Sequence, residues 1–288
     1  MAVVALIPIG SMEHLALAPS LRRIFPDHTF VVLPAERHMD GFTSSDLSLP
    51  PKPGPTIQIP TTLQNLVKTL VNAIFPSRRG ERIDFAYVVE DLELFNQGHP
   101  DVVLEQFREA VSQYVETQWP QQAEPRFREV RERCSFHLFR PMTEAYFYGD
   151  PEALQRARVQ RQPLLPDGVD LELFRTIDQN YLDLPPKSKD ITDHPQRGNH
   201  PKSYLQYLCD PTLSDKNLRY RETHEGKAAL ESLNWELILQ HPSRCPFLTA
   251  FLDDLSWALD WHLPFVDSEN VDPRVRVFRT QNRILRNL

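Results

Sequence analysis

The first half of the chain alternates continuous apolar runs with segments of helical periodicity, and this order restricts the folds that the sequence can adopt. VVALIPI at 3–9, FVVLPA at 30–35 and FAYVV at 85–89 are apolar at nearly every position, which is typical of strands buried on both faces. CSFHLFRP at 134–141 alternates well enough to form a fourth strand. This order predicts an α/β fold with a mainly parallel sheet flanked by helices.

Helical segments lie between and after these predicted strands. After the first strand, Ser11 is expected to cap a helix that Pro26 ends. The segments 63–74 and 100–119 have the apolar spacing of amphipathic helices. Asp150, which is followed by a proline, is expected to be the N-cap of a further helix.

The composition changes in the second half, where polar stretches rich in Pro, Lys and Arg separate short helical segments. We therefore expect an α/β domain over residues 1–155 and a mostly helical extension over 156–288. Trp235, Trp257 and Trp261 fall on apolar helix faces and are expected in the core. The extension ends in a basic tail with no acid after its last aspartate, which indicates a polyanion or an acidic partner surface. Its arginines are Arg274, Arg276, Arg279, Arg283 and Arg286.

Composition and missing motifs exclude several functional classes. The 288 residues carry a formal net charge of −7, so the surface as a whole repels nucleic acid, and a polyanion would need a local basic region. Neither GxGxxG nor GxxxxGK[ST] occurs, which argues against the common dinucleotide and P-loop nucleotide sites. No run of about 18 apolar residues is present, and the three cysteines form no CxxC pair. We expect a cytoplasmic protein with reduced thiols and no membrane span.

Acidic residues follow two of the predicted strands. Glu13 comes shortly after the first strand, and Asp91 and Glu93 follow the strand at 85–89. In an open parallel sheet the carboxyl ends of the strands meet at one edge, and carboxylate oxygens are the ligands that Mg²⁺ and Mn²⁺ favour. The spacing alone leaves two interpretations open, a metal site or solvated strand ends, since an acid in the first turn of a helix is also favoured by the helix dipole.

The same residues carry a resemblance to a known superfamily. VVALIPIGSMEHLALAPSLRRIF followed by FAYVVEDLEL resembles the Toprim signature, which has a Glu after the first strand and an acidic-x-acidic pair ending a later one. RCSFHLFRPMTEAYFYGDPEAL, at 133–154, resembles an uncharacterised bacterial Toprim-like family often encoded beside ATPases in defence-type loci. Two features depart from the superfamily pattern: Gly10 lies three residues ahead of Glu13, and the acidic pair is Asp-Leu-Glu.

This resemblance implies a Toprim-like domain that hydrolyses phosphodiesters with Mg²⁺ or Mn²⁺, as a nuclease acting on nucleic acid beside an ATPase partner. It assigns Glu13, Asp91 and Glu93 to metal binding and catalysis. Glu144 is either a further metal ligand or a polar residue on a helix face. The expected phosphate contacts lie in the family-like stretches of the second half and are Lys202, Arg219, Arg221 and Lys227.

Two other functions stay open at this stage. The Asp-Leu-Glu variant and the pI near 5.8 favour a non-catalytic interaction subunit, in which the Toprim domain is degenerate and the arginine tail docks a partner. A small-molecule phosphate enzyme is the third interpretation. The sequence does not choose between DNA, RNA and nucleotide substrates, and it does not indicate an oligomeric state.

Overall fold

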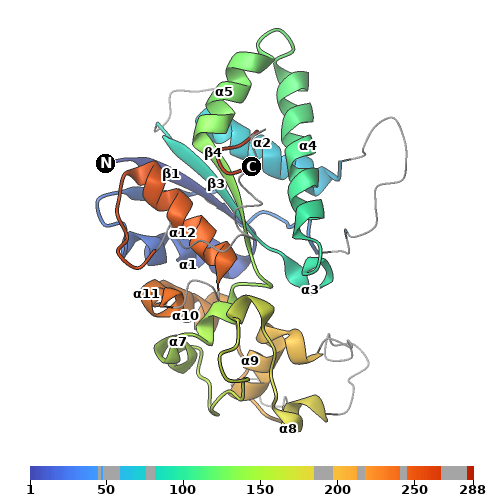
Figure 1. Cartoon of the computed structure of the whole chain (residues 1–288), viewed down its shortest axis with the longest axis vertical. Helices are drawn as coiled ribbons and strands as arrows, with labels where there is room; N and C mark the ends of the chain where they lie inside the picture. The colour runs from blue at the N-terminus through green and yellow to red at the C-terminus, as the bar shows by residue number, and fades with distance from the viewer. Residues whose placement is uncertain are drawn as a thin grey trace.

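The computed structural model describes residues 1–44, 47, 59–75, 82–184, 197–212, 218–240, 245–266 and 284–288. Within these ranges, four strands form one all-parallel sheet with the order β2-β1-β3-β4 (Figure 1). The strands are β1 Val3–Pro8, β2 Thr29–Val32, β3 Phe85–Asp91 and β4 Cys134–Phe139. The predicted α/β class is confirmed, with its parallel sheet, flanking helices and helical C-terminal region.

The strands of the sheet face two separate cores. In β1, Val4 and Leu6 pack into one core, whereas Ala5 and Ile7 pack into the other, and all four side chains are fully buried. Successive side chains of a strand point to opposite faces, so a sheet covered on both sides needs an apolar residue at nearly every position. This requirement explains the continuous apolar runs in the sequence.

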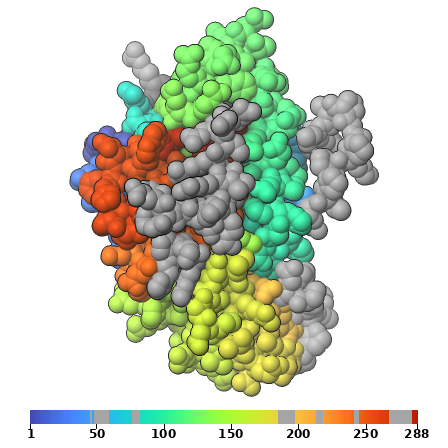
Figure 2. Space-filling view, in the orientation of Figure 1, coloured from blue at the N-terminus to red at the C-terminus, as the bar shows by residue number. Residues whose placement is uncertain are grey.

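Helices cover both faces of the sheet (Figure 1). The first core is closed by α1 Ser11–Arg22, α10 Lys227–Glu231, α11 Trp235–Leu239 and α12 Pro246–Leu259. The second is closed by α2 Thr61–Ile74, α4 Pro100–Gln118 and α5 Ala123–Arg133. The short helices are α3 Glu93–Asn96, α6 Glu144–Phe147, α7 Pro151–Arg156, α8 Gln179–Leu182 and α9 Pro201–Cys209. The helices after residue 156 therefore complete the core around the sheet as well as extending beyond it, and in Figure 2 the yellow part of this region forms the lower end of the molecule.

The predicted ends of the first helix are partly wrong. Gly10 occupies the N-cap position and Ser11 is already helical, while the helix ends at Arg22, before the proline expected to stop it. The prediction for α7 is confirmed, because the Asp150 side chain accepts a hydrogen bond from the N–H of Glu152 at 2.9 Å.

The tryptophans divide between core and surface. Trp235 is buried and its indole N–H donates to Ser20 Oγ at 3.0 Å, as expected of a core residue. Trp257 is 78% exposed, so its predicted place in the core is wrong. Its ring packs against the guanidinium of Arg286 at 4.5 Å. Trp261 is partly buried against the first core.

The last described residues dock along the edge strand β4. The N–H of Arg286 donates to the carbonyl of Cys134 at 2.7 Å. The side-chain amide of Asn287 accepts from the N–H of Phe136 at 3.0 Å and donates to its carbonyl at 2.6 Å. Asn287 therefore satisfies the same two groups that a neighbouring strand would satisfy.

The same segment places Arg286 in a buried ion pair with Asp254 of α12, with 2.7 Å between Nη2 and Oδ1. Asp254 also accepts from Ser135 Oγ at 2.7 Å, and its Oδ2 lies 3.1 Å from His137 Nε2. Arg286 thus stabilises the fold instead of offering a charge to a partner. The other four tail arginines lie outside the described residues.

Two expectations from composition agree with the structure. Cys134, Cys209 and Cys245 are all free and buried, as expected of reduced core thiols. None of the helices in the described ranges is both long and apolar enough to cross a bilayer.

Replacing Arg286 with Ala is expected to lower the free energy of unfolding by roughly 2–4 kcal/mol, because it leaves the Asp254 carboxylate buried without its cation. Urea unfolding followed by circular dichroism measures this change. Arg82→Ala is the control, because the Arg82 side chain is 88% exposed in its ion pair with Asp84, and such a pair is worth about 1 kcal/mol or less. Equal losses in the two variants would contradict the importance of the buried pair.

Candidate metal centre at the carboxyl ends of the strands

The strand order creates a crevice at the carboxyl edge of the sheet. The chain runs outward from β1 to β2 and then returns to place β3 on the other side of β1. The loops after β1 and β3 therefore leave the sheet in opposite directions, and ligands of α/β proteins bind at such switch points. A cavity of about 270 Å³ lies there, lined by residues that follow all four strands.

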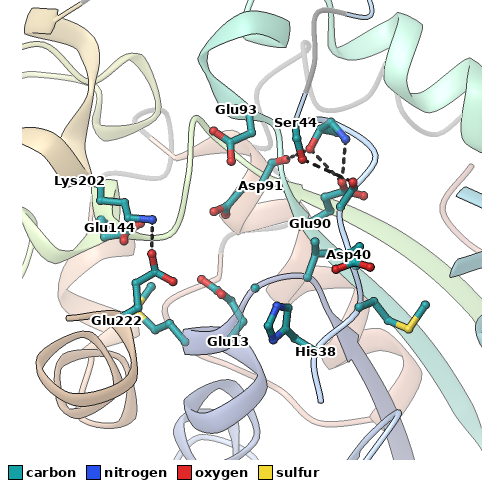
Figure 3. A pocket seen from close by; sticks show the side chains of 16 residues that line it. Glu13, His38, Asp40, Ser44, Glu90, Asp91, Glu93, Glu144, Lys202 and Glu222 are labelled. Atoms are coloured by element: carbon teal, nitrogen blue, oxygen red, sulfur yellow. Dashed lines mark hydrogen bonds and ion pairs between the residues drawn. The ribbon is translucent and has the colours of Figure 1, made fainter. Parts of the chain in front are cut away.

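Four predicted acids line this cavity (Figure 3). Glu13 lies in the first turn of α1 after β1, and Asp91 is the last residue of β3. Glu93 is the first residue of α3, and Glu144 is the first residue of α6 after β4. The structure therefore brings the three acids predicted after the first and third strands together with Glu144, for which the sequence leaves two roles open.

Gly10 allows Glu13 to fold back over the start of its own helix. Gly10 has φ +108°, a conformation that favours glycine. A Cβ atom at this position would lie 2.4 Å from Oε2 of Glu13. The glycine three residues ahead of Glu13 is thus required for the position of that carboxylate, which is only 4% exposed.

Hydrogen bonds and backbone conformation fix the acids after β3. Asp91 Oδ1 accepts from the N–H of Thr143 at 3.0 Å and from its hydroxyl at 3.2 Å, which ties the end of β3 to the loop after β4. Glu93 has φ +64°, an unfavourable conformation for a residue with a side chain, at a cost of about 1–3 kcal/mol. Its N–H donates to the carbonyl of Pro141 at 2.8 Å. This strained turn places the Glu93 and Asp91 carboxylates side by side (Figure 3).

The second half of the chain closes the cavity opposite the strand ends. Tyr220 donates its hydroxyl proton to Glu144 Oε1 at 3.2 Å. The ammonium of Lys202, near the start of α9, pairs with Glu222, which begins a π-helical turn at Glu222–Gly226. Ser11 Oγ donates to the other carboxylate oxygen of Glu222 at 3.0 Å. The sequence predicts Lys202 as a phosphate contact but does not assign Glu222 to the site.

Glu90 is a second residue that the sequence did not assign to the site. Its Oε1 accepts three hydrogen bonds, from the N–H of Phe42 at 2.8 Å and from the N–H and hydroxyl of Thr43 at 3.0 and 2.9 Å. The buried carboxylate thereby holds the loop after β2, which brings His38 and Asp40 to the cavity wall. Alternation along the strand is the sequence signal that Glu90 has a different role from Asp91, because successive side chains of β3 point to opposite sides.

The cavity is strongly acidic. Within the described part of the chain, Lys202 is the one lysine or arginine that lines it, and His38 is the one histidine. Seven carboxylic acids line the same space: Glu13, Asp40, Glu90, Asp91, Glu93, Glu144 and Glu222.

Burial and mutual repulsion raise the carboxyl pKa values. Burial, with a further contribution from Glu144, raises the pKa of Glu13 to about 8. Burial and the charge of Glu13 raise the pKa of Asp91 well above its usual range. Burial raises the pKa of Glu93 to about 7 against the lowering effect of Lys202, and burial also raises the pKa of Glu144. All four carboxylates can be ionised together at neutral pH only if more positive charge enters the cavity.

The donor chemistry of the cluster fits a hard divalent cation. The four acids offer only carboxylate oxygens, and Mg²⁺ and Mn²⁺ prefer oxygen ligands. Among the residues that the structure describes, no three His, Cys, Asp or Glu side chains are arranged to hold an ion as they stand. Ligation therefore requires side-chain rotation around a cavity whose position the backbone already fixes.

Three of the predicted phosphate contacts lie away from this cavity. Arg219 is exposed, and neither it nor Arg221 nor Lys227 lines the cavity. Arg221 pairs with Glu225 at 2.8 Å, and Lys227 pairs with Glu231 at 2.8 Å. Only Lys202 of the predicted basic residues reaches the acids.

Comparisons with known proteins identify no relative of this chain. No family model matches the sequence, and no curated protein or solved structure matches it significantly.

Gly10→Ala is expected to weaken Mn²⁺ binding on the order of tenfold or more, because the new methyl group displaces the Glu13 carboxylate. Calorimetry at pH 7.5 measures the affinity, and a melting curve verifies that the variant is folded. Gly98→Ala is the matched control, since a Cβ atom there meets nothing within 4 Å. Unchanged affinity in a folded Gly10→Ala protein would rule out this role of the glycine.

The raised pKa values predict that the metal-free protein becomes less stable as the pH rises. A glutamate carboxyl ordinarily has a pKa of 4.5, and burial raises the pKa of Glu13 to about 8. Between these pH values the folded state binds more protons than the unfolded state, so the free energy of unfolding decreases with pH. We expect the melting temperature to fall between pH 5 and 8, by roughly 2–4 °C per kcal/mol lost. Glu13→Gln should reduce this dependence, and a wild-type melting temperature that rises over the interval would contradict it.

Proposed function

We propose that this protein is a metal-dependent phosphodiesterase of Toprim type, a nuclease that uses Mg²⁺ or Mn²⁺. The observation that carries the proposal is the convergence of four carboxylates from three strand ends on one cavity at the switch point of a parallel sheet. Glu13, Asp91, Glu93 and Glu144 would hold the cation. When bound, the ion would neutralise phosphate charge and lower the pKa of an attacking water.

The charge of the cavity supports a strict dependence on the cation. Seven acids and a single lysine line the described part of the cavity, so a phosphodiester anion would be repelled from the metal-free site. The need for a cation before phosphate can enter favours metal-dependent hydrolysis over a metal-free phosphate site. It also explains how a protein with a formal net charge of −7 could act on a polyanion.

The chain's own residues have separate roles in the proposed hydrolysis. The water oxygen would form a new bond to phosphorus while one P–O ester bond breaks, and the departing oxygen would take up a proton from solvent water. An oxygen of the Glu93 carboxylate that does not contact the ion would accept the proton that the water loses. Lys202 would contact a non-bridging oxygen, and Thr143 holds Asp91 in position through two hydrogen bonds.

Calorimetry with Mn²⁺ and Mg²⁺ tests the proposal directly. Wild type should bind the ion, and the double variant Glu13→Gln, Asp91→Asn should lose binding. The control is Glu105→Gln, whose carboxylate is exposed beside Arg108 and does not line the cavity. With Mn²⁺ present, hydrolysis of bis(p-nitrophenyl) phosphate and of single- and double-stranded DNA and RNA should fall at least about 100-fold in the double variant.

Wild type that gives no binding heat at millimolar metal would overturn the proposal. The non-catalytic interaction subunit would then become the leading hypothesis, with the acids as remnants of a Toprim site. The next experiment in that case is a search for the protein partner, for which an ATPase is the proposed class.

A further inference from the structure

Lys202 and Glu222 form an ion pair inside the candidate site (Figure 3). The Lys202 side chain is 35% exposed and that of Glu222 is 30% exposed, so the pair lies partly shielded from water. Lys202 comes from α9 and Glu222 from the π-helical turn, which are separate elements of the second half of the chain. Both side chains line the cavity together with the strand-end acids.

The ammonium of Lys202 interacts with more than its direct partner. Burial by itself would lower its pKa, but the charges of Glu144, Glu222 and Asp91 outweigh burial and raise it. Lys202 also counteracts the raised pKa of Asp91 and Glu93. It therefore supplies positive charge to the same carboxylates that are proposed to bind the metal.

Glu222 is held in place as the partner of this lysine. Its second carboxylate oxygen accepts from Ser11 Oγ at 3.0 Å, and Ser11 opens the helix that carries Glu13. The hydrogen bond and the nearby ammonium outweigh burial and lower the pKa of Glu222, so this acid stays ionised. Lys202 has a long and flexible side chain, whereas Glu222 is also held by Ser11 through its other oxygen.

We propose that Lys202 is an internal counter-ion that exchanges with the divalent cation. In the metal-free protein its ammonium pairs with Glu222 and neutralises part of the acidic cluster. Cation binding neutralises the cluster and repels the ammonium, which then leaves Glu222 and becomes available to a substrate phosphate. This inference rests on the proposed metal site and adds a regulated step to it: the phosphate contact forms only in the loaded protein.

The exchange has a simple physical basis. A divalent ion and the Lys202 ammonium would neutralise the same acidic cluster, and two like charges in a shielded cavity repel each other strongly. The Lys202 stem can rotate without moving α9, because the charge sits at the end of four methylene groups. In the metal-free protein, the ion pair with Glu222 keeps Lys202 from holding phosphate in a site that is not yet ready for hydrolysis.

Chemical labelling of lysines tests the exchange without using activity. The full chain is treated with a limiting amine acylating reagent, with and without saturating Mn²⁺ or Mg²⁺, and the labelled lysines are quantified by mass spectrometry. Lys202 should label severalfold faster with metal, because its amine has left Glu222. Lys227 is the matched control: its side chain is 39% exposed and pairs with Glu231, outside the cavity, so its labelling should not change.

Two further measurements separate the possible failures. Calorimetry on the same samples reports whether metal binds at all, and no binding would overturn both the exchange and the proposed function. Metal binding with unchanged or slower Lys202 labelling would overturn the exchange alone and leave the metal site standing. Glu222→Gln should raise Lys202 labelling before any metal is added and reduce the further increase on metal addition. An unchanged metal response in that variant would also overturn the exchange.

Discussion

Repulsion between buried carboxylates is the constraint on which this site depends. A parallel sheet brings its strand ends to one edge, and this chain places Glu13, Asp91, Glu93 and Glu144 there around one cavity. Such a cluster costs stability unless protons or cations neutralise it. Several features of the fold hold the acids in place despite this cost: the glycine at position 10, the strained turn at Glu93 and the two hydrogen bonds from Thr143. Backbone strain of this kind is found mainly at active sites and ligand-binding positions.

The sheet and the acids of the first half could be predicted because both depend on local patterns. Continuous apolar runs predict strands buried on both faces, and acids at strand ends are brought together by the parallel topology itself. Glu90 and Glu222 could not be assigned in this way. The role of Glu90 depends on contacts with the loop after β2, which folds back onto it. The place of Glu222 in the site depends on the packing of the second half of the chain against α1.

The predictions for Trp257 and Arg286 were wrong for the same reason, because local patterns do not reveal contacts between distant segments. Helical periodicity identifies the apolar face of α12, but it does not indicate which residues at the border of that face are covered. Trp257 falls outside the covered region and is exposed. A basic tail suggested a docking surface, yet Arg286 is buried because Asp254 offers a partner from a distant helix. In both cases a contact between distant segments decided the outcome.

The docking of residues 284–288 on β4 also affects how copies of this protein can meet. An uncovered edge strand is a template for pairing with another chain. Here the Asn287 amide already occupies the N–H and carbonyl of Phe136, and Arg286 occupies the carbonyl of Cys134. A second molecule could extend the sheet at β4 only after displacing this segment and its buried leucines. Residues 284–288 thus protect the β4 edge of the sheet against pairing with a second molecule.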